Sequence, residues 1–342
     1  MRADSAVASF RAAMTPHYVV GPGAVRYTLE QIQWAESIGY DDVWLADAGG
    51  IDALTMAAIA LQNTRRIRVG IAVVPAYTRT PAVLAATVAT LADLAPGRFA
   101  LGLGTSSEAM IAGWHGLSLD RPVPRMRETM ALLRTILAGE KTAFEGETLR
   151  SNGYSQPPLA SPVPVLLAAL GPRMTDLAAA DSDGVILNLV PLPVADTLIG
   201  RIRTAAAAVG RESSSVEISS RVPVLVTDDP DAGRNAFRRL FAPYYANPVY
   251  NRFMAWCGYP SEAAILLEAA RAGDWRRARA AMPDPLVDSI AIIGDAAQCR
   301  KRLRALIDAG ITTPIVCCLS PDLAIQTTTY TALAPAAIQT QP

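Results

Sequence analysis

Two stretches of this sequence place small residues and hydrogen-bond donors directly after apolar runs. Gly104–Ser107 follows the apolar run 99–103, and Gly171–Arg173 follows the run 164–170. Small residues let a flat ring or a phosphate approach the main chain without meeting a Cβ atom, and outward N–H groups can bind an anion. In the second stretch, a proline at the first turn of a helix and an adjacent arginine favour an anion at the helix N-terminus. These two stretches predict a site for a ring and its phosphate.

Several polar side chains that follow other apolar runs have both a functional and a structural interpretation. Asp47 either contacts a ligand or caps the helix that follows it. Arg79 either faces a substrate, together with Tyr77, or forms a structural ion pair. His115 is either a catalytic residue at the mouth of a pocket or the cap of a helix. His17 is a proton donor or a loop residue, and we favour the loop.

The sequence lacks the residues that several other kinds of active site need. The segment GLGTSS at 102–107 has serine where a dinucleotide-binding fingerprint needs its third small residue, and no acidic residue ends a strand about twenty positions later. Two histidines and the absence of a GxSxG motif argue against a Ser–His–Asp triad. The four cysteines, at 257, 299, 317 and 318, have no metal-ligand spacing. We therefore predict reduced thiols and no metal.

The elements that must position these residues alternate between short buried strands and amphipathic helices. The expected strands are 7–14, 43–46, 67–74, 99–103, 164–170, 184–190, 216–227 and 311–319, and the expected helices are 28–39, 52–64, 81–94, 126–137, 173–180, 194–209 and 295–309. Residues 142–154 are expected to form a hairpin with Asn152-Gly153 as its tight turn. Segment 231–288 is expected to be helical, with its aromatic residues packed as a core in preference to lining a substrate pocket.

Strict alternation of strands and helices requires a parallel sheet, which leaves two architectures: a (β/α)8 TIM barrel or a doubly wound open sheet. Seven clear strands, one weaker strand and a length of 342 residues favour the barrel. We therefore predict an α/β fold, a single TIM-barrel domain over residues 1–342 with a helical insertion before the last helix and strand. In a barrel, chemistry lies at the carboxyl ends of the strands, where the two small-residue stretches lie.

Composition excludes several classes of partner. The chain is 51% hydrophobic and 18% charged, which is typical of a protein with a packed core. Lys and Arg total 31, as do Asp and Glu, so net charge favours neither nucleic acid nor a membrane surface. The longest apolar runs are too short for a membrane span, and the N-terminus has no signal-peptide pattern. We expect a cytoplasmic enzyme that acts on a small-molecule substrate.

Five motifs resemble those of the bacterial-luciferase-like superfamily, in the same order and with similar spacing. They are GYDDVWLAD (39–47), PAYTRTPAVLA (75–85), LAPGRFALGLGTSS (94–107), PVPVLLAALGPRM (162–174) and DGVILNLVP (183–191). They are more similar to the branch that uses the deazaflavin coenzyme F420, which includes proteins like methylenetetrahydromethanopterin reductase. The resemblance spans residues 28–320 and is weakest over 231–288.

This resemblance implies a role for each matched residue. Asp47 would lie near the cofactor ring, and the third strand would carry a bulge or a non-proline cis peptide bond behind that ring. Asp47 and His115 would be the catalytic residues. The cofactor-binding residues would be Asp47, Ala72, Val73, Val74, Gly104, Thr105, Ser106, Ala168, Ala169, Gly171, Pro172 and Arg173, and the substrate residues would be Tyr77, Arg79 and Trp114.

The same resemblance implies an oxidoreductase that transfers a hydride between F420 and a small organic substrate. The acceptor would be a C=C or C=N bond or a methylene-pterin-like group. One alternative is a monooxygenase that uses FMN, and another is a barrel subunit without catalytic activity. A homodimer is also expected, because dimers are common in the superfamily.

Overall fold

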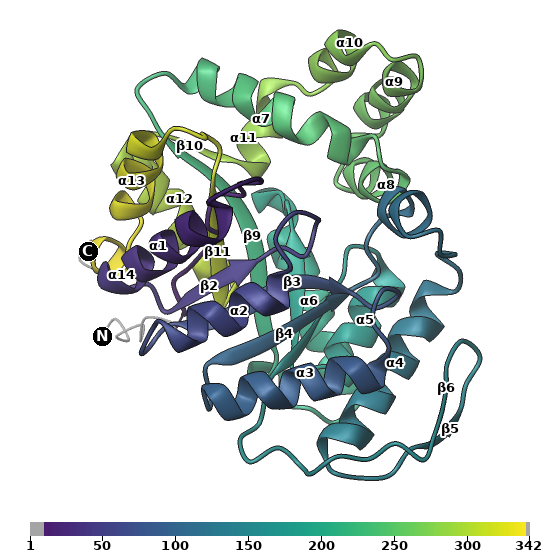
Figure 1. Cartoon of the computed structure of the whole chain (residues 1–342). Helices are drawn as coiled ribbons and strands as arrows, with labels where there is room; N and C mark the ends of the chain where they lie inside the picture. The colour runs from purple at the N-terminus through teal and green to yellow at the C-terminus, as the bar shows by residue number, and fades with distance from the viewer. Residues whose placement is uncertain (1–9, 340–342) are drawn as a thin grey trace, which may run out of the picture.

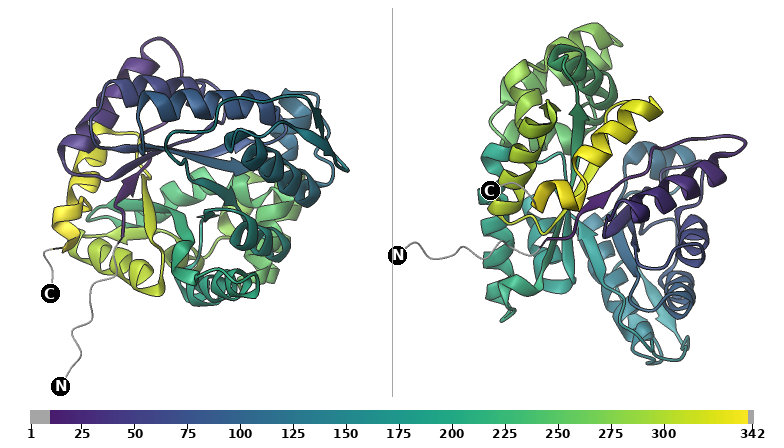
Figure 2. Two further views of the ribbon diagram at one scale, coloured as in Figure 1. Left: turned by 90° about the horizontal axis from the view of Figure 1, so that it is seen from below. Right: turned by 90° about the vertical axis from the view of Figure 1, so that its left-hand side faces the viewer.

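The computed structural model describes residues 10–339, and its centre is a barrel of eight parallel strands (Figures 1 and 2). Each strand pairs with the next, and pairing of β8 with β9 and of β11 with β1 closes the ring. This closure confirms the predicted TIM barrel and excludes the open sheet. In barrel order the strands are β1 (Ala13–Met14), β2 (Asp42–Leu45), β3 (Arg68–Pro75), β4 (Phe99–Gly104), β7 (Val165–Ala168), β8 (Gly184–Asn188), β9 (Glu217–Val226) and β11 (Thr313–Cys318).

Helices surround this barrel, and Figure 2 (left) shows them outside the strands. Their ends follow the capping residues in the sequence: Asp52 accepts a hydrogen bond from the Thr55 N–H, and Gly310, at φ 115°, ends α12. The outer helices are α1 (Ala24–Ser37), α2 (Ala53–Gln62), α3 (Pro81–Leu94), α4 (Pro122–Leu137), α5 (Pro172–Asp181), α6 (Leu192–Ala208), α12 (Ala296–Ala309), α13 (Leu323–Ala332) and α14 (Pro335–Gln339). None of the helices in residues 10–339 is long and apolar enough to cross a membrane.

The predicted helical insertion lies between β9 and a short strand, β10 (Ile292–Gly294), which pairs with the end of β9. In Figure 1 it lies at the top, beyond the carboxyl end of β9. It consists of α7 (Pro230–Tyr245), α8 (Pro248–Trp256), α9 (Pro260–Arg271), α10 (Trp275–Ala280) and α11 (Asp284–Ile290). Two single-turn elements complete the fold, the π-helix η1 (Ala109–Trp114) after β4 and the 3-10 helix η2 (Ser213–Ser215) before β9.

The hairpin exists, but the predicted position of its turn is wrong. Its strands are β5 (Ala143–Glu145) and β6 (Arg150–Asn152), so the turn spans residues 146–149 and Asn152 is inside a strand. The reason is the buried carboxylate of Glu128 on α4, which accepts the N–H groups of residues 147, 148 and 149 at 2.6, 2.9 and 2.8 Å. This tertiary contact fixes the turn where no local turn residue indicates it.

The first strand is shorter than predicted. Within the expected strand 7–14, β1 covers Ala13–Met14, and residues 7–9 lie outside the described part of the chain. β1 is nevertheless the strand that closes the ring, because it pairs with both β11 and β2.

A small apolar cluster fills the barrel and is separate from the larger core between strands and helices. Trp44 is its largest member, and Gly70 on the next strand leaves room for it, because a Cβ at Gly70 would lie 2.5 Å from the indole ring. The other members are Ala13, Ala100, Leu166, Ile186 and Ile315, and the partly buried Ala72, Val73 and Ala168 pack against them. These last three lie nearest the carboxyl ends of their strands, so they form the upper surface of the filling.

At the opposite end, charged residues close the barrel. Arg68 donates hydrogen bonds to Asp42 at 3.1 Å and to Glu217 at 2.7 Å, and each of these residues begins its strand. Arg11 donates a second pair of hydrogen bonds to Asp42, at 2.6 and 2.9 Å, and the Thr313 hydroxyl donates to Glu217 at 2.7 Å. The Asp42 side chain has no exposed area. This network stabilises the amino-terminal end of the barrel and leaves the carboxyl end for ligands.

This network predicts a specific acid sensitivity. Burial raises the pKa of Glu217, but hydrogen bonds and the charge of Arg68 outweigh it, so the pKa is lower than the ordinary 4.5. A lowered carboxyl pKa stabilises the fold fully above the unfolded-state value and less as pH falls through the folded-state value. We therefore expect the unfolding midpoint to fall between about pH 5 and pH 3 more steeply in the wild type than in Glu217→Gln, measured by thermal unfolding. Equal slopes would contradict a role for this carboxylate.

Candidate cofactor and substrate site

Three neighbouring strands form a floor of small side chains at the barrel mouth. Val73 on β3, Gly104 on β4 and Ala168 on β7 are in contact: a Cβ built at Gly104 would lie 2.4 Å from Val73 Cγ2 and 3.5 Å from Ala168 Cβ. The Ala72–Val73 peptide bond is cis, and the pairing of β3 with β4 shifts register between Ile71 and Val74. The family resemblance implied one or the other of these features, and the structure has both. Ala72 and Val73 are partly exposed, whereas Val74 is buried and points away from the mouth into the outer core.

The expectation of bare main chain at Gly104 needs correction. Gly104 is buried, because the Val73 side chain packs across it. The glycine is therefore needed for contact between two strands, and the ligand-accessible residues of this loop are the partly exposed Thr105, Ser106 and Ser107. Ser106 has a φ of 61°, a left-handed conformation that is uncommon for a residue with a side chain and is often found at functional sites.

This packing gives a direct test. Gly104→Ala should lower the free energy of unfolding by about 1–3 kcal/mol through overpacking against Val73. Adding Val73→Ala makes room for the new methyl group, so the double variant should be more stable than the sum of the two single effects. Urea unfolding of the four proteins measures this coupling. Strict additivity would show that the two side chains do not compete for one space.

The second small-residue stretch forms an uncapped helix N-terminus. Gly171 precedes α5 in an extended conformation, Pro172 is the first helical residue, and no side chain caps the helix. The N–H groups of the first turn thus have no side-chain acceptor, and the helix dipole favours a negative charge there. Gly171, Pro172 and Arg173 are exposed, and a Cβ at Gly171 would meet open space. Ala168, which is part of the floor, and Ala169 precede this helix terminus in the chain, so the floor and the terminus lie next to each other.

Asp47 does not cap α2, because Asp52 does. Instead, Arg79 joins the two carboxylates, with Asp47 at 3.4 Å and a closer contact to Asp52. Burial lowers the pKa of Arg79, but the hydrogen bond with Asp52 and the charge of Asp47 outweigh it and raise the pKa. The structural interpretation of Arg79 therefore holds, and Arg79 fixes Asp47 at the end of β2.

The remaining predicted residues lie on the loop between β4 and α4 or hold it. Tyr77 donates to the Asp120 carbonyl at 2.6 Å and packs under Arg125, whose guanidinium lies 5.2 Å from the ring centroid. The Trp114 ring lies 3.5 Å from a Cβ built at Gly49, which brings this loop to the end of β2. His115 follows η1, is exposed, and its imidazole has no partner within residues 10–339. Nothing in this geometry assigns His115 a reaction.

His17 lies after β1, on the same side of the barrel as the floor. Its N–H donates to Gln31 Oε1 at 2.7 Å, which holds the loop on α1. Burial lowers the pKa of its imidazole, so the neutral form is favoured. The loop interpretation is consistent with this placement.

Sequence reasoning missed a polar group on the far wall of the mouth. Arg221 on β9 is the register partner of Asn188 on β8 and of Ile315 on β11. Ile315 and Ile186 belong to the barrel filling, and side chains alternate along a strand, so Arg221 and Asn188 face the interior. Arg221 Nη2 lies 3.2 Å from Cys317 Sγ. The available signal was a charged residue in the middle of the strand sequence ISSRVPVLV.

The insertion covers this wall with aromatic side chains. The Phe241 ring lies 5.7 Å from the Arg221 guanidinium, and the Tyr250 hydroxyl accepts a hydrogen bond from Asn188 Nδ2 at 2.8 Å. Tyr244 and Tyr250 pack edge to face, with centroids 5.7 Å apart. Much of the aromatic segment is core packing, as predicted, but these contacts also make it the roof over Asn188 and Arg221.

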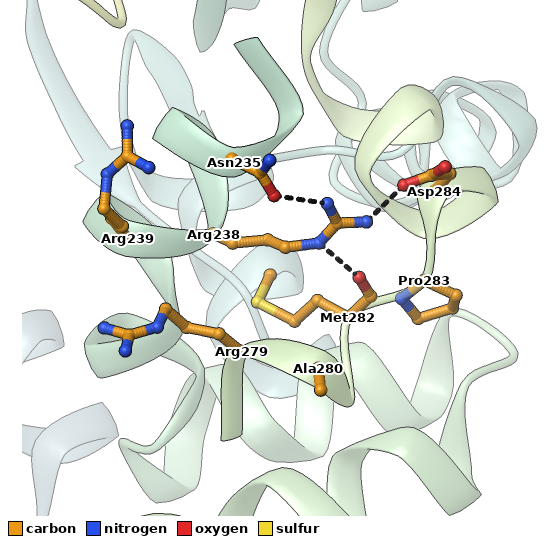
Figure 3. Close-up of a pocket in the computed structure, with 8 residues that line it drawn as sticks. All are labelled: Asn235, Arg238, Arg239, Arg279, Ala280, Met282, Pro283 and Asp284. Carbon is orange, nitrogen blue, oxygen red and sulfur yellow. Dashed lines mark hydrogen bonds and ion pairs between the residues drawn. The ribbon is translucent and has the colours of Figure 1, made fainter. Parts of the chain in front are cut away.

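A separate cavity of about 640 Å³ lies inside the insertion, between α7, α10 and α11 (Figure 3). Arg238 crosses it and bonds to Asn235, to the Met282 carbonyl and to Asp284. Arg239 and Arg279 extend from neighbouring helices to the same side of the close-up. No predicted cofactor residue lines this cavity. Across residues 10–339, no group of three or more His, Cys, Asp or Glu side chains is arranged to hold a metal ion.

Comparison with known proteins agrees with this geometry. A curated relative, 5,10-methylenetetrahydromethanopterin reductase of Methanolobus tindarius, is 28% identical over 280 residues, which cover 81% of this chain and 86% of that protein. Among solved structures, the coenzyme F420-dependent tetrahydromethanopterin reductase of Methanopyrus kandleri superposes with a TM-score of 0.76 at 21% identity, covering 92% of this chain and 94% of that one. An F420-dependent secondary alcohol dehydrogenase, solved with an F420-acetone adduct, gives 0.74 at 19% identity, with 96% and 99% covered.

The model of the luciferase-like monooxygenase family matches residues 5–313. This match includes all eight strands of the barrel in whole or in part, the floor at its mouth and the uncapped N-terminus of α5. The chain therefore belongs to the luciferase-like monooxygenase family.

Proposed function

We propose that this protein is an oxidoreductase that transfers a hydride between coenzyme F420 and a small organic substrate. The observation that carries the proposal is the juxtaposition, on adjacent strands, of a floor of small side chains and an exposed, uncapped helix N-terminus. A flat ring needs the first and its phosphate needs the second. The relatives and solved structures that are named for F420 support the choice of a deazaflavin.

The described residues fit such a coenzyme. Ala72, Val73 and Ala168 would lie against the ring, since they form the exposed top of the barrel filling. The first turn of α5, with Arg173, would bind the phosphate through main-chain donors and a guanidinium. Asp47, fixed by Arg79, would contact the edge of the ring. When bound, the deazaflavin supplies or accepts the hydride, while the protein orients both molecules and excludes water.

Within this proposal the substrate carries a C=C or C=N bond or a methylene-pterin-like group. The substrate would bind between two surfaces of the barrel mouth. Tyr77 and Trp114, at the loop between β4 and α4, form one surface, and the aromatic roof of the insertion forms the other. The protein then acts as a rigid support for two planar groups.

The alternative within the family is a monooxygenase that uses FMN, which the family's description supports. Titration of the purified protein with F420 and with FMN, followed by ligand fluorescence, separates the two. We expect F420 to bind at least tenfold more tightly than FMN, and chemically reduced FMN to consume oxygen no faster with the protein than without it. Tighter FMN binding, with faster oxygen consumption by reduced FMN in the presence of the protein, would overturn the proposal. Binding of neither would favour a barrel without catalytic activity.

A further inference from the structure

Arg221 is a cation without a counter-ion. It lies in a strand whose other residues are mainly apolar, and no carboxylate forms an ion pair with it within residues 10–339. Arg68, which also faces the barrel interior, has two carboxylate partners, Asp42 and Glu217. Placing a cation in a protein interior without compensation is costly, so natural proteins pair such groups or bind an ion with them.

The surroundings of Arg221 do not neutralise it. Its guanidinium interacts with the Cys317 sulfur at 3.2 Å and with the Tyr244 hydroxyl, and the Phe241 ring offers a cation–π contact at 5.7 Å, so none of its partners is a carboxylate. Its Nε is buried and has no hydrogen-bond partner. A guanidinium prefers a planar oxyanion that takes two parallel hydrogen bonds, and neither a thiol nor a phenyl ring provides this.

Two more polar atoms, one on the neighbouring strand β8 and one in the roof, are also unsatisfied. Asn188 Oδ1 and the Tyr245 hydroxyl are buried without a partner, while Asn188 Nδ2 is fixed by Tyr250 at 2.8 Å. Tyr245 packs against Tyr250, with ring centroids 6.3 Å apart. Buried polar atoms without partners are rare in folded proteins, and here one lies on β8, one on β9 and one in the roof that covers these strands. Leu189, directly after Asn188, has a φ of 56°, a conformation that fixes the end of β8 in an uncommon form.

We propose that Arg221 binds a carboxylate of the substrate beside Asn188. The inference rests on the proposed function, because it assigns the carboxylate to the molecule that reacts with the hydride. The substrate is then a small organic acid, with its charged end against β8 and β9 and its reacting end toward the floor of Ala72, Val73 and Ala168. Arg221 neutralises the carboxylate, and Asn188 Oδ1 receives a hydrogen bond from a neighbouring group of the ligand.

The test uses coenzyme-free protein, so it does not depend on F420 binding. Short carboxylates from acetate to hexanoate are compared with their primary amides, which have the same shape without the charge. We expect carboxylates to raise the unfolding midpoint saturably and the amides to have no effect. Arg221→Met should weaken carboxylate binding by at least about 30-fold, the range for truncating one partner of a buried charge pair. Arg221→Lys should retain part of it.

Arg239→Met is the matched control, because it removes an exposed arginine of the insertion. It should leave carboxylate binding unchanged. The proposal is overturned if carboxylates and amides act alike on the wild type, or if the carboxylate effect persists in Arg221→Met.

Two further readouts separate this role from a structural or a coenzyme role. Without ligand, Arg221→Met should unfold at the wild-type temperature or higher, because it removes an uncompensated charge. A fall of several degrees would make Arg221 structural. The F420 affinity of Arg221→Met should equal that of the wild type. A loss of tenfold or more would assign the anion to the coenzyme and overturn the proposal.

Discussion

Gly171→Trp should weaken F420 binding by about 100-fold while leaving the unfolding midpoint unchanged. The fold tolerates the change, because a Cβ at Gly171 meets open space and the residue is extended, at φ −91°. The indole would cover the first turn of α5, whose main-chain N–H groups are proposed to bind the phosphate. Loss of two charge-assisted hydrogen bonds, each worth about 1.5 kcal/mol, corresponds to about two factors of ten in affinity.

Gly200→Trp provides the control for this change. Gly200 lies in α6, and a Cβ there also meets nothing within 4 Å. The same large side chain on an outer helix should leave F420 affinity unchanged, as measured by fluorescence titration. Equal affinities for wild type and Gly171→Trp would place the phosphate elsewhere and remove the main support for the proposed coenzyme site.

Arg68→Met should be the most destabilising of these substitutions, by about 3 kcal/mol or more in urea unfolding. It leaves the fully buried Asp42 carboxylate and the Glu217 carboxylate without their shared guanidinium, and breaking a buried pair by removing one partner costs about 3–5 kcal/mol. Arg11 still neutralises part of the charge on Asp42, which favours the lower end of that range.

A double-mutant cycle isolates the interaction. Arg68→Met combined with Glu217→Gln should be more stable than the sum of the single effects, because the second change removes a carboxylate that the first leaves unpaired. Arg201→Met serves as the surface comparison. Arg201 pairs with Asp176 at 2.6 Å, but both side chains are almost half exposed, at 44% and 48%, so the cost should be within about 1 kcal/mol. Similar losses at the two arginines would contradict the importance of burial.

The sequence predicts the barrel well because its signals are local. Buried β-branched runs and capped helices alternate, and such an alternation has few solutions. The hairpin turn was misplaced for the opposite reason: Asn152-Gly153 is a strong local turn signal, but the Glu128 carboxylate, distant in sequence, fixes residues 147–149. A buried acceptor that satisfies three N–H groups outweighs a turn preference.

Some residues of the candidate site could be predicted from local motifs, and others could not. The residues of the floor and of the α5 N-terminus follow from their motifs, and the structure brings Val73, Gly104 and Ala168 together. That Gly104 accommodates Val73 could not be predicted, because this requires the relative position of two strands. The wall formed by Asn188 and Arg221 was missed because its polar character arises from three strands and a roof of helices that are far apart in the chain.

The two ends of the insertion meet at the rim, where the Thr227 N–H donates to the Gly294 carbonyl at 2.9 Å and β10 lies beside the end of β9. The insertion therefore leaves the barrel and returns to it at neighbouring positions. Its exchange for the corresponding segment of a relative would thus replace the roof over Asn188 and Arg221 without interrupting the ring of strands. The residues that cover this wall can therefore change while the strands that close the barrel stay the same.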